Sequence, residues 1–321
     1  MRYFVTGGAG FIGSNYIEHL FQNVEKVTGV TIYDKFTYAA NPRNYQKFAN
    51  DPRLSVIQGD ICDFNLIENS MANHDFVVHF AAESHVDRSI HDASAFVQTN
   101  VLGTFNVLEV SRILGIKTLI HISTDEVYGS LSEGSADETF TLEPNSPYAA
   151  SKAASDLLAH SYFVTHGLDV RTTRCCNNYG KHQYPEKVIP VFINKLKSGQ
   201  KLPIYGDGKN VREWIHVNDH ARGIQTVLEK GNPGEIYNIG TGTRLSNNDL
   251  ASEIIKVMGL DESMKSYVTD RRGHDFRYSV DSRKLESLGF ERKIDFIDGL
   301  KATIDWYTTN ASWWNTQSEV N

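Results

Sequence analysis

The chain has 321 residues, about twice the ~150 residues of a typical domain, so we expect two domains or one large domain with an added lobe. Hydrophobic residues make up 40% of the chain and charged residues 22%, which excludes disordered, collagen-like and coiled-coil classes. The 32 Lys and Arg residues are outnumbered by 39 Asp and Glu residues, and the formal net charge of -7 gives no general attraction to phosphate backbones. We therefore expect a folded protein without a nucleic-acid partner.

Three cysteines, Cys62, Cys175 and Cys176, have neither the number nor the spacing of a disulfide framework or a zinc site. They indicate a reducing compartment and no metal. No apolar run approaches the ~20 residues that span a bilayer, and the first residues lead directly into an apolar, strand-like segment. The sequence thus predicts a cytoplasmic protein with no membrane partner.

The first half of the chain alternates short apolar, β-rich runs with segments of helical spacing. Such alternation is typical of an α/β fold in which helices cover both faces of a parallel sheet and right-handed crossovers join the strands. We therefore expect a Rossmann-type, doubly wound parallel sheet. Its strands are expected at residues 2–6, 27–33, 54–58, 75–80, 118–123 and 168–173.

The second half follows a different rhythm, because prolines break it into shorter pieces. Short strands are expected there at residues 202–205, 212–217 and 235–239. This pattern predicts a main domain at residues 1–180 and a smaller C-terminal α/β substrate lobe at residues 181–321. Segments of the later half are free to return to the main sheet.

A glycine loop, with Gly7, Gly10 and Gly13 in a G-x-x-G-x-x-G pattern, joins the first expected strand to the first helix. Glycine permits a tight turn and a close backbone approach, and the helix N-terminus offers N–H groups and the positive end of its dipole to a pyrophosphate. The glycines alone leave an ordinary strand-to-helix turn as the alternative. The loop therefore indicates a dinucleotide site only together with its surroundings.

Two acidic residues at expected strand ends supply those surroundings. Asp34 lies about 20 residues beyond the loop, where a carboxylate accepts hydrogen bonds from ribose hydroxyls and repels a 2′-phosphate. Lys35 offsets part of that repulsion, but no arginine follows the loop, so the sequence favours NAD over NADP. Asp60 and Ile61 are placed to contact the adenine, although an aspartate at a strand end also commonly caps the next helix.

Tyr148 and Lys152 stand four residues apart, on one face of a helix expected to begin near Pro147. An ammonium beside a phenol lowers the pKa of the phenol, which makes tyrosinate available as a base near neutral pH. A solvated helix surface is the alternative explanation of this spacing. Ser123 and Thr124 favour the catalytic explanation, because they end an expected strand, where open α/β sheets bind ligands.

These motifs together resemble the short-chain dehydrogenase/reductase superfamily, in its extended branch that acts on sugar nucleotides. Residues 123–129, with the run Thr124-Asp125-Glu126, resemble the motif of the dTDP-glucose 4,6-dehydratases, and the resemblance extends to about Tyr307. It implies a lyase that uses NAD. Further segments resemble this family in the same order along the chain: residues 34–39, 81–90, 174–180, 206–214 and 270–275.

The resemblance also implies which residues meet each ligand. Cofactor contacts fall on Gly7, Gly10, Phe11, Ile12, Gly13, Asp34, Lys35, Thr37, Asp60, Ile61, Ala81, Ala82, Tyr148 and Lys152. Contacts to the nucleotide sugar fall on Ser84, Thr124, Asn177, Arg212, Arg271 and His274. Arginine suits two-pronged binding of a phosphate, but a surface position is its usual fate, and Asn177 could equally be a turn residue.

A homodimer is implied as well, joined through the helix at residues 94–114 and the helix that carries Tyr148. Asn100 matches an asparagine that the superfamily has in the first of these helices. A polar residue in an otherwise apolar helix face more often packs than reacts, so we expect Asn100 to be structural.

The expected chemistry needs two carboxyl groups, because the C5 proton of a hexose becomes acidic only after C4 is oxidised to a ketone. Tyr148, held by Lys152, is expected to take the O4 proton while C4 passes a hydride to NAD, and Thr124 to hydrogen-bond the same oxygen. Glu126 then removes the C5 proton and a protonated Asp125 donates to the departing C6 hydroxyl. The hydride returns to C6 and C5 is reprotonated, so dTDP-glucose becomes dTDP-4-keto-6-deoxyglucose.

Four alternatives remain open at this point. A 4-epimerase of the same superfamily needs neither acid, and a decarboxylase usually lacks the aspartate, so Asp125 discriminates against both. The Asp125-Glu126 pair alone could also be a helix N-terminal pair favoured by the dipole. A nonenzymatic NAD-responsive protein commonly loses the Tyr and Lys pair. The sequence does not decide whether the substrate carries dTDP or UDP. It does not decide the pathway either, since the product feeds rhamnose and rarer deoxysugars.

Overall fold

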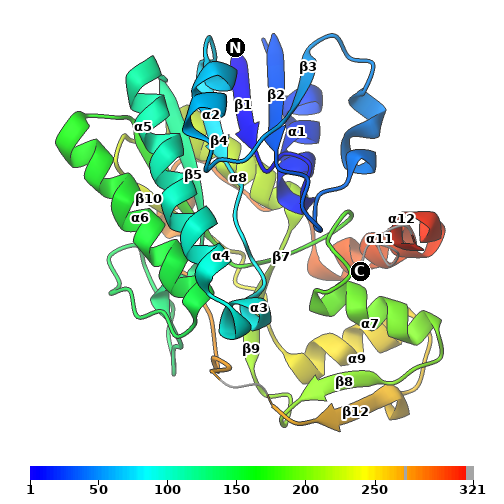
Figure 1. Ribbon diagram of the computed structural model, residues 1–321. Coiled ribbons are helices and arrows are strands. Elements are labelled where there is room, and N and C mark those ends of the chain that lie inside the picture. The colour runs from blue at the N-terminus through cyan, green and yellow to red at the C-terminus, as the bar shows by residue number, and fades with distance from the viewer. Residues whose placement is uncertain (271–272, 316–321) are drawn as a thin grey trace.

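A seven-stranded parallel sheet forms the main body of the computed structural model, which describes residues 1–270 and 273–315 (Figure 1). The strand order is β10-β6-β5-β4-β1-β2-β3. This sheet confirms the predicted α/β, Rossmann-type fold. Its strands are β1 (Arg2–Thr6), β2 (Gly29–Asp34), β3 (Leu54–Gln58), β4 (Phe76–His79), β5 (Thr118–Thr124), β6 (Val170–Cys175) and β10 (Ile236–Ile239).

Helices cover both faces of this sheet because its strands are apolar on both sides. Successive residues of a strand point to opposite faces, so in β1 Tyr3 and Val5 pack into one hydrophobic core and Phe4, between them, into another. The first core includes residues of α1 (Phe11–Asn23) and α8 (Val217–Lys230), and the second includes residues of α2 (Phe64–Met71), α5 (Thr104–Leu114) and α6 (Pro147–His166).

The helix expected at residues 94–114 is one helical segment in three parts. It begins as α4 (Ser94–Phe96), passes through the π-helical turn η2 (Val97–Gly103) and continues as α5. Asn100 is buried in the π turn, where its Oδ1 accepts the N–H of Glu83 at 2.8 Å and its Nδ2 donates to Ser151 Oγ at 2.9 Å. π turns recur where a helix must present such a group, and here the turn ties the segment after β4 to α6.

The second lobe has its own small sheets and its own core. In Figure 1 its helices α7 and α9 and its strands β8 and β12 lie together, away from the edge strand β3. Its elements are β7 (Asn177–Tyr179), α7 (Val188–Lys197), β8 (Leu202–Tyr205), β9 (Val211–His216), β11 (Arg244–Ser246), α9 (Asn247–Val257), η4 (Glu262–Met264), β12 (Lys265–Val268), α11 (Phe296–Thr309) and α12 (Ala311–Asn315). The remaining short helices are η1 (Pro42–Phe48), α3 (Val86–His91), η3 (Asp125–Tyr128) and α10 (Arg283–Ser287).

Part of the later half does return to the main sheet. β10 pairs in parallel with β6, with Ile236 opposite Thr172, and α8 packs against α1. Residues 217–239 therefore belong to the main body by position, although they follow residue 180. The division into domains at residues 1–180 and 181–321 stays a prediction about folding units.

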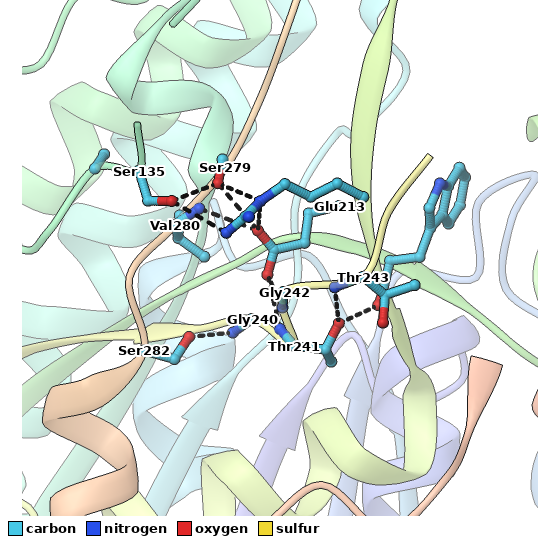
Figure 2. A network of polar contacts seen from close by, with 12 residues as sticks. Ser135, Glu213, Gly240, Thr241, Gly242, Thr243, Ser279, Val280 and Ser282 are labelled. Atoms are coloured by element: carbon cyan, nitrogen blue, oxygen red, sulfur yellow. Dashed lines mark hydrogen bonds and ion pairs between the residues drawn. The ribbon is translucent and has the colours of Figure 1, made fainter. Parts of the chain in front are cut away.

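A buried carboxylate fastens the lobe to the segments beside it (Figure 2). Glu213 of β9 is fully buried and accepts the backbone N–H groups of Thr241 at 2.7 Å and Gly242 at 2.8 Å. It also accepts the N–H of Val280 at 3.2 Å and lies 3.5 Å from Arg244 Nε. Because strand residues alternate, the neighbours of Glu213 in β9 point away from this network, toward the opposite face of the strand.

Candidate active site

A cavity of about 360 Å³ lies at the carboxyl ends of β1, β2, β4, β5 and β6. Doubly wound sheets bind their ligands at this edge, and ligand cavities usually measure about 300–1,000 Å³. The lobe contributes the opposite wall, with side chains that include Gln183, Val188 and Trp214. The cavity thus joins the two parts of the molecule.

The glycine loop forms one end of this cavity and is shaped for a close backbone approach. Gly7 has a φ of +67°, and a Cβ there would lie 2.7 Å from the backbone N of Ala81. A Cβ on Gly13 would overlap the carbonyl oxygen of Gly7. The N-cap of α1, Gly10, makes no side-chain capping hydrogen bond, so the first N–H groups of the helix stay open to an anion. These features favour the dinucleotide interpretation over an ordinary turn.

Asp34 and Asp60 line the same end of the cavity. Asp34 accepts the backbone N–H groups of Ala9 at 3.0 Å and Phe36 at 2.9 Å, and burial raises its pKa although these two bonds oppose the shift. Asp60 forms an ion pair with Lys35 at 2.7 Å.

The alternative role of Asp60 as a helix cap is wrong. Asp63 caps α2 by accepting the N–H of Leu66 at 3.0 Å. Asp60 is therefore not needed as a cap, and it lines the cavity wall.

The predicted cofactor residues gather in this cavity, apart from Gly13, which lies beneath the loop against Gly7 and Gly8. Those that line the wall are Gly7, Gly10, Phe11, Ile12, Asp34, Lys35, Thr37, Asp60, Ile61, Ala81, Ala82, Tyr148 and Lys152. An open helix N-terminus, a carboxylate at the end of β2 and an apolar wall together fit a dinucleotide.

Tyr148 and Lys152 reach the cavity from the first turns of α6. The helix begins at Pro147 because Ser146 Oγ accepts the N–H of Ala149 at 3.1 Å and proline suits the first helical position. Burial lowers the pKa of Lys152 to about 8, and its Nζ donates to the carbonyl oxygen of Ile122 at 2.7 Å. An ammonium that titrates this close to neutrality suits proton-transfer chemistry.

The Tyr148 hydroxyl lies among groups that pull its pKa in opposite directions. Burial raises the pKa, the charge of Glu126 adds to that rise, and a hydrogen bond with Thr124 opposes it. The expectation that Lys152 lowers this pKa is therefore wrong for the site without ligand, where burial raises it instead. The solvated helix surface, the alternative for this pair, is wrong, because Lys152 is only 4% exposed.

Asp125 and Glu126 occupy the first turn of η3, where Thr124 is the N-cap and accepts the N–H of Glu126 at 3.3 Å. Both acids line the cavity, so their position in the first turn of a helix is compatible with a role in the site. Burial raises the pKa of Asp125 well above its usual range, Glu126 and Glu213 add to the rise, and Arg212 opposes it. Burial thus favours the protonated form of Asp125, which is the form that can donate a proton.

Several buried polar atoms lack a hydrogen-bond partner within the part of the chain that the structure describes, and some of them belong to residues that line this cavity. Those in the cavity wall are Ser123 Oγ, Asp125 Oδ2, Gln183 Oε1 and Trp214 Nε1. Buried polar groups are normally paired, so this set indicates a polar ligand that supplies both donors and acceptors.

Gln183 and Trp214 were missed by the sequence reasoning, as were Glu186 and Lys187 in the same wall. Trp214 lay within the segment 206–214 that carried the family resemblance, but no local pattern marked its indole N–H. Gln183 had no signal at all, because its place in the wall depends on contacts of the folded chain.

The predicted nucleotide-sugar residues divide between the wall and its surroundings. Ser84, Thr124 and Asn177 line the cavity, and Asn177 begins strand β7, so the turn alternative for it is wrong. Arg212 and His274 are not among the lining residues. Arg271 lies outside the described residues.

Arg212 is buried beside the cavity wall and is held by backbone carbonyls. Its Nη2 donates to the carbonyl oxygen of Asp275 at 2.9 Å, and its guanidinium stacks over the ring of Tyr278 at 4.3 Å. His274 Nδ1 lies 2.7 Å from Asp270 Oδ1. Direct contact of Arg212 and His274 with substrate stays a prediction.

Over the parts of the chain that the structure describes, no helix is long and apolar enough to cross a membrane. In the same residues, no group of three or more His, Cys, Asp or Glu side chains could hold a metal ion. The three cysteines are free.

The parallel sheet, the glycine loop and the pair Tyr148 and Lys152 beside Thr124 define a Rossmann-type enzyme of the short-chain dehydrogenase/reductase superfamily. The family model described as GDP-mannose 4,6 dehydratase matches residues 4–303. A dTDP-glucose 4,6-dehydratase of Streptomyces griseus is 52% identical over 312 residues, which are 97% of this chain and 95% of that protein. The chain belongs to the dTDP-glucose 4,6-dehydratase family, as the resemblance predicted.

Solved structures agree with this assignment. DesIV, a dTDP-glucose 4,6-dehydratase from Streptomyces venezuelae determined with NAD bound, is 50% identical and superposes with a TM-score of 0.97 over 99% of this chain and 100% of its own. A UDP-glucose 4-epimerase from Thermotoga maritima has a TM-score of 0.89 at 29% identity over 97% of this chain and 100% of its own. The fold is therefore shared with 4-epimerases, and the site must distinguish the two activities.

Proposed function

We propose that the chain converts dTDP-glucose into dTDP-4-keto-6-deoxyglucose, with NAD as its resident cofactor. The observation that carries this proposal is Asp125: a buried carboxyl group with one unpartnered oxygen and a raised pKa, in the same cavity as Tyr148 and Lys152. A 4-epimerase has no water to remove and needs no such acid. The family of the chain and the acid in its site therefore support the same activity.

NAD would be held by the glycine loop and by the ends of β2 and β3. The open N-terminus of α1 suits its pyrophosphate, and Asp34 suits the ribose hydroxyls of its adenosine half. Asp60 and Ile61 are proposed for the adenine pocket. When bound, NAD would supply the acceptor for the hydride of C4 and the donor of that hydride to C6.

We propose that Tyr148 is the base that accepts the O4 proton during C4 oxidation. Lys152, one helical turn further along α6, orients it and supplies positive charge to the same pocket. Thr124, which is hydrogen-bonded with Tyr148, is proposed to bind the same substrate oxygen. Oxidation at C4 thus uses groups from the end of β5 and the start of α6.

Elimination of water is assigned to the two acids of η3. Glu126 is proposed to remove the C5 proton once C4 is a ketone, and Asp125 to protonate the departing C6 hydroxyl. Burial and the neighbouring carboxylates push Asp125 toward its acid form, which divides the two roles between adjacent residues. Glu126, protonated in that step, is proposed to return a proton to C5 when the hydride adds to C6, so no further acid is required.

The nucleotide sugar is proposed to contact Ser84, Asn177, Arg212, Arg271 and His274. Arg212 uses Nη1 and Nη2 for carbonyl oxygens of the chain, and a guanidinium has five N–H donors, so it keeps donors for a diphosphate. We add the unpartnered atoms Gln183 Oε1 and Trp214 Nε1 to this set.

A homodimer is proposed for the chain. Exposed apolar side chains gather on η2, α5 and α6, and α5 packs against α6. Leu157 and Val164 of α6 are 62% and 64% exposed, and exposed apolar patches mark surfaces that bind other molecules. Two copies would bury these helices as a four-helix bundle. The other contributors are Val97, Leu102, Phe105 and Ile113.

Cytoplasmic location is also proposed, since the free cysteines suit a reducing compartment. The product is proposed to enter deoxysugar biosynthesis, for which rhamnose is one destination. The domain division at residues 1–180 and 181–321 is proposed with the catalytic residues on the first part and with residues 217–239 returning from the second part to the main body.

The test of the proposed function is turnover of dTDP-glucose by the purified protein without added cofactor. We expect that unfolding of the purified protein releases NAD, and that the product is a 4-keto-6-deoxy sugar. UDP-glucose is run in parallel to determine whether the enzyme prefers thymine or uracil in its substrate. Product with the mass of the substrate and inverted C4 configuration would instead establish an epimerase.

A further inference from the structure

One helical turn beyond Lys152, α6 carries a third polar residue in line with Tyr148 and Lys152. Tyr148, Lys152 and Asp156 follow one another at intervals of four residues, so they share one face of the helix. Asp156 is only 4% exposed. One of its oxygens accepts Arg174 Nε at 2.9 Å, and the other lies 3.2 Å from His121 Nε2. A buried carboxylate with two partners is therefore fixed one turn beyond Lys152.

The same contacts continue to the helix that carries the two acids. Arg174 Nη1 donates to the Tyr128 hydroxyl at 2.9 Å, and that hydroxyl donates to Asn238 Oδ1 at 2.8 Å. Tyr128 is the last residue of η3, whose first residue is Asp125. Asp156, Arg174 and Tyr128 thus form a buried bridge between α6 and η3, and each is at most 4% exposed.

Asp156 is the carboxylate whose charge acts on Lys152: it raises the pKa of that ammonium, against the effect of burial. Burial lowers the pKa values of His79 and His121, so both are neutral near pH 7, and burial raises the pKa of Cys175 to about 12. Burial alone would raise the pKa of Asp156, but His121 and Arg174 together lower it. The titratable and charged groups that surround the pair of Lys152 and Asp156 are His79 of β4, His121 of β5, Tyr148 of α6, and Arg174 and Cys175 of β6.

We propose that Asp156 is a positioning residue of the reaction: it supplies the counter-charge that keeps the Lys152 ammonium charged, and through Arg174 and Tyr128 it fixes η3 relative to α6. The inference rests on the proposed function, because it assigns Lys152 and the η3 acids to the oxidation and elimination steps. It makes one carboxylate responsible for the alignment of two pairs of catalytic residues.

Physical chemistry favours a role in alignment over a role in stability. A buried ion pair gains little stability relative to a well-packed apolar pair, whereas its fixed geometry specifies one arrangement of its neighbours. The bridge also joins segments far apart in sequence, because Arg174 on β6 reaches α6 on one side and η3 on the other. Loss of the Asp156 charge would leave Arg174 uncompensated and lower the pKa of Lys152 further below about 8.

The test compares Asp156→Asn with Asp156→Glu by the pH profile of C4 oxidation and of product formation in the full-length, NAD-loaded enzyme. The Asn variant is expected to lose at least about tenfold in rate near pH 8, with the alkaline limb moved by about one pH unit toward acid. The sign follows because a less stable ammonium is lost at lower pH. The Glu variant is expected to restore the position of the limb.

Asp169→Asn is the matched control, because that carboxylate pairs with Arg171 at the other end of β6. It is expected to keep the wild-type profile. An Asn variant of Asp156 that is folded, holds NAD and keeps the wild-type alkaline limb would overturn the proposal, even if its rate is reduced. Wild-type turnover of dTDP-glucose is measured separately, so failure of the proposed function is distinguished from failure of this inference.

Tyr128→Phe keeps the proposal testable if Asp156→Asn does not fold. It removes only the hydroxyl that Arg174 and Asn238 share. We expect product formation to slow by about three- to tenfold, while C4 oxidation keeps its rate and its alkaline limb. Equal rates of both steps in the variant and the wild type would refute the bridge.

Discussion

The two walls of the cavity hold their functional groups in different ways. On the sheet side, Asp34 and Thr124 end strands of one parallel sheet, and Tyr148 and Lys152 stand in the first turns of the helix that follows. On the lobe side, groups reach the cavity from a loop and a short strand, and Arg212 is fixed by carbonyl oxygens.

The difference shows that functional groups on the sheet side are positioned by local secondary structure, whereas those on the lobe side are positioned by contacts between distant segments. Parallel strands bring their carboxyl ends to one edge of the sheet, so strand-end residues converge whatever the loops do. The lobe has no such rule. Its wall depends on clamps such as the Glu213 network, which joins segments far apart in sequence.

The largest expected effect comes from removal of the catalytic base on the sheet side of the cavity. Tyr148→Phe is expected to lower kcat about 10²- to 10⁴-fold, because it removes the phenolic oxygen that, as tyrosinate, accepts the O4 proton, with KM within about twofold of the wild type. Steady-state rates with dTDP-glucose measure both. Tyr267→Phe, on the exposed edge of the lobe, is the control and should change neither value.

Replacement of the acids should separate the two chemical steps. We expect Asp125→Asn and Glu126→Gln to slow loss of water about 10²- to 10³-fold, because each loses one proton-transfer role, while C4 oxidation remains. Single-turnover measurements that follow oxidation and product formation in the same sample check this. Dehydration at the parent rate in both variants would contradict the acid and base assignments.

A change on the lobe side should act on binding more than on chemistry. Trp214→Phe retains an aromatic ring but removes the unpartnered indole N–H, so KM for the nucleotide sugar is expected to rise about five- to tenfold with kcat nearly unchanged. Trp306→Phe, away from the cavity, is the comparison. A fall in kcat with unchanged KM would place the Trp214 N–H among transition-state contacts instead, and would remove the contrast between the two walls.

The smallest expected effect concerns stability and pH. Burial raises the folded pKa of Asp125 above its unfolded value, so its contribution to stability is fully present below the unfolded pKa and is lost as pH rises through the folded pKa. Asparagine does not titrate. Asp125→Asn should therefore melt close to the wild type near pH 4 and about 2–4 °C above it near pH 8.

Thermal melts across that range, at equal NAD content, measure this gap. Asp207→Asn serves as the control, because Asp207 is exposed and its hydrogen bond with Lys209 lowers its pKa. A gap for Asp125→Asn that stays constant with pH would show that the carboxyl is ionised in the folded protein.

Strands and the cofactor end were the parts most readily predicted from sequence. The predicted strands at residues 2–6 and 54–58 match β1 and β3, because short apolar runs bounded by turns leave few alternatives. Gly7 and Asp34 could be assigned because a tight turn and a strand-end carboxylate have local signatures. Local rules sufficed where the function depends on strand ends.

Other features could not be read from local sequence. The π turn at η2 has the same apolar spacing as an α-helix, so nothing marked it. The return of β10 to the main sheet depends on pairing with β6, which lies far earlier in the chain, and periodicity does not encode such a pairing. The orientation of Gln183 and the buried setting of Arg212 likewise depend on packing between distant segments.

The most direct test of the central claim is mass spectrometry of the product formed from dTDP-glucose in heavy water, without added cofactor. The account predicts that the product has lost one water and carries the original C4 hydrogen at C6. It also predicts one solvent deuterium at C5, because the proton held by Glu126 exchanges with solvent. A product of unchanged mass, or a dehydrated product without deuterium at C5, would contradict the roles assigned to Tyr148, Asp125 and Glu126.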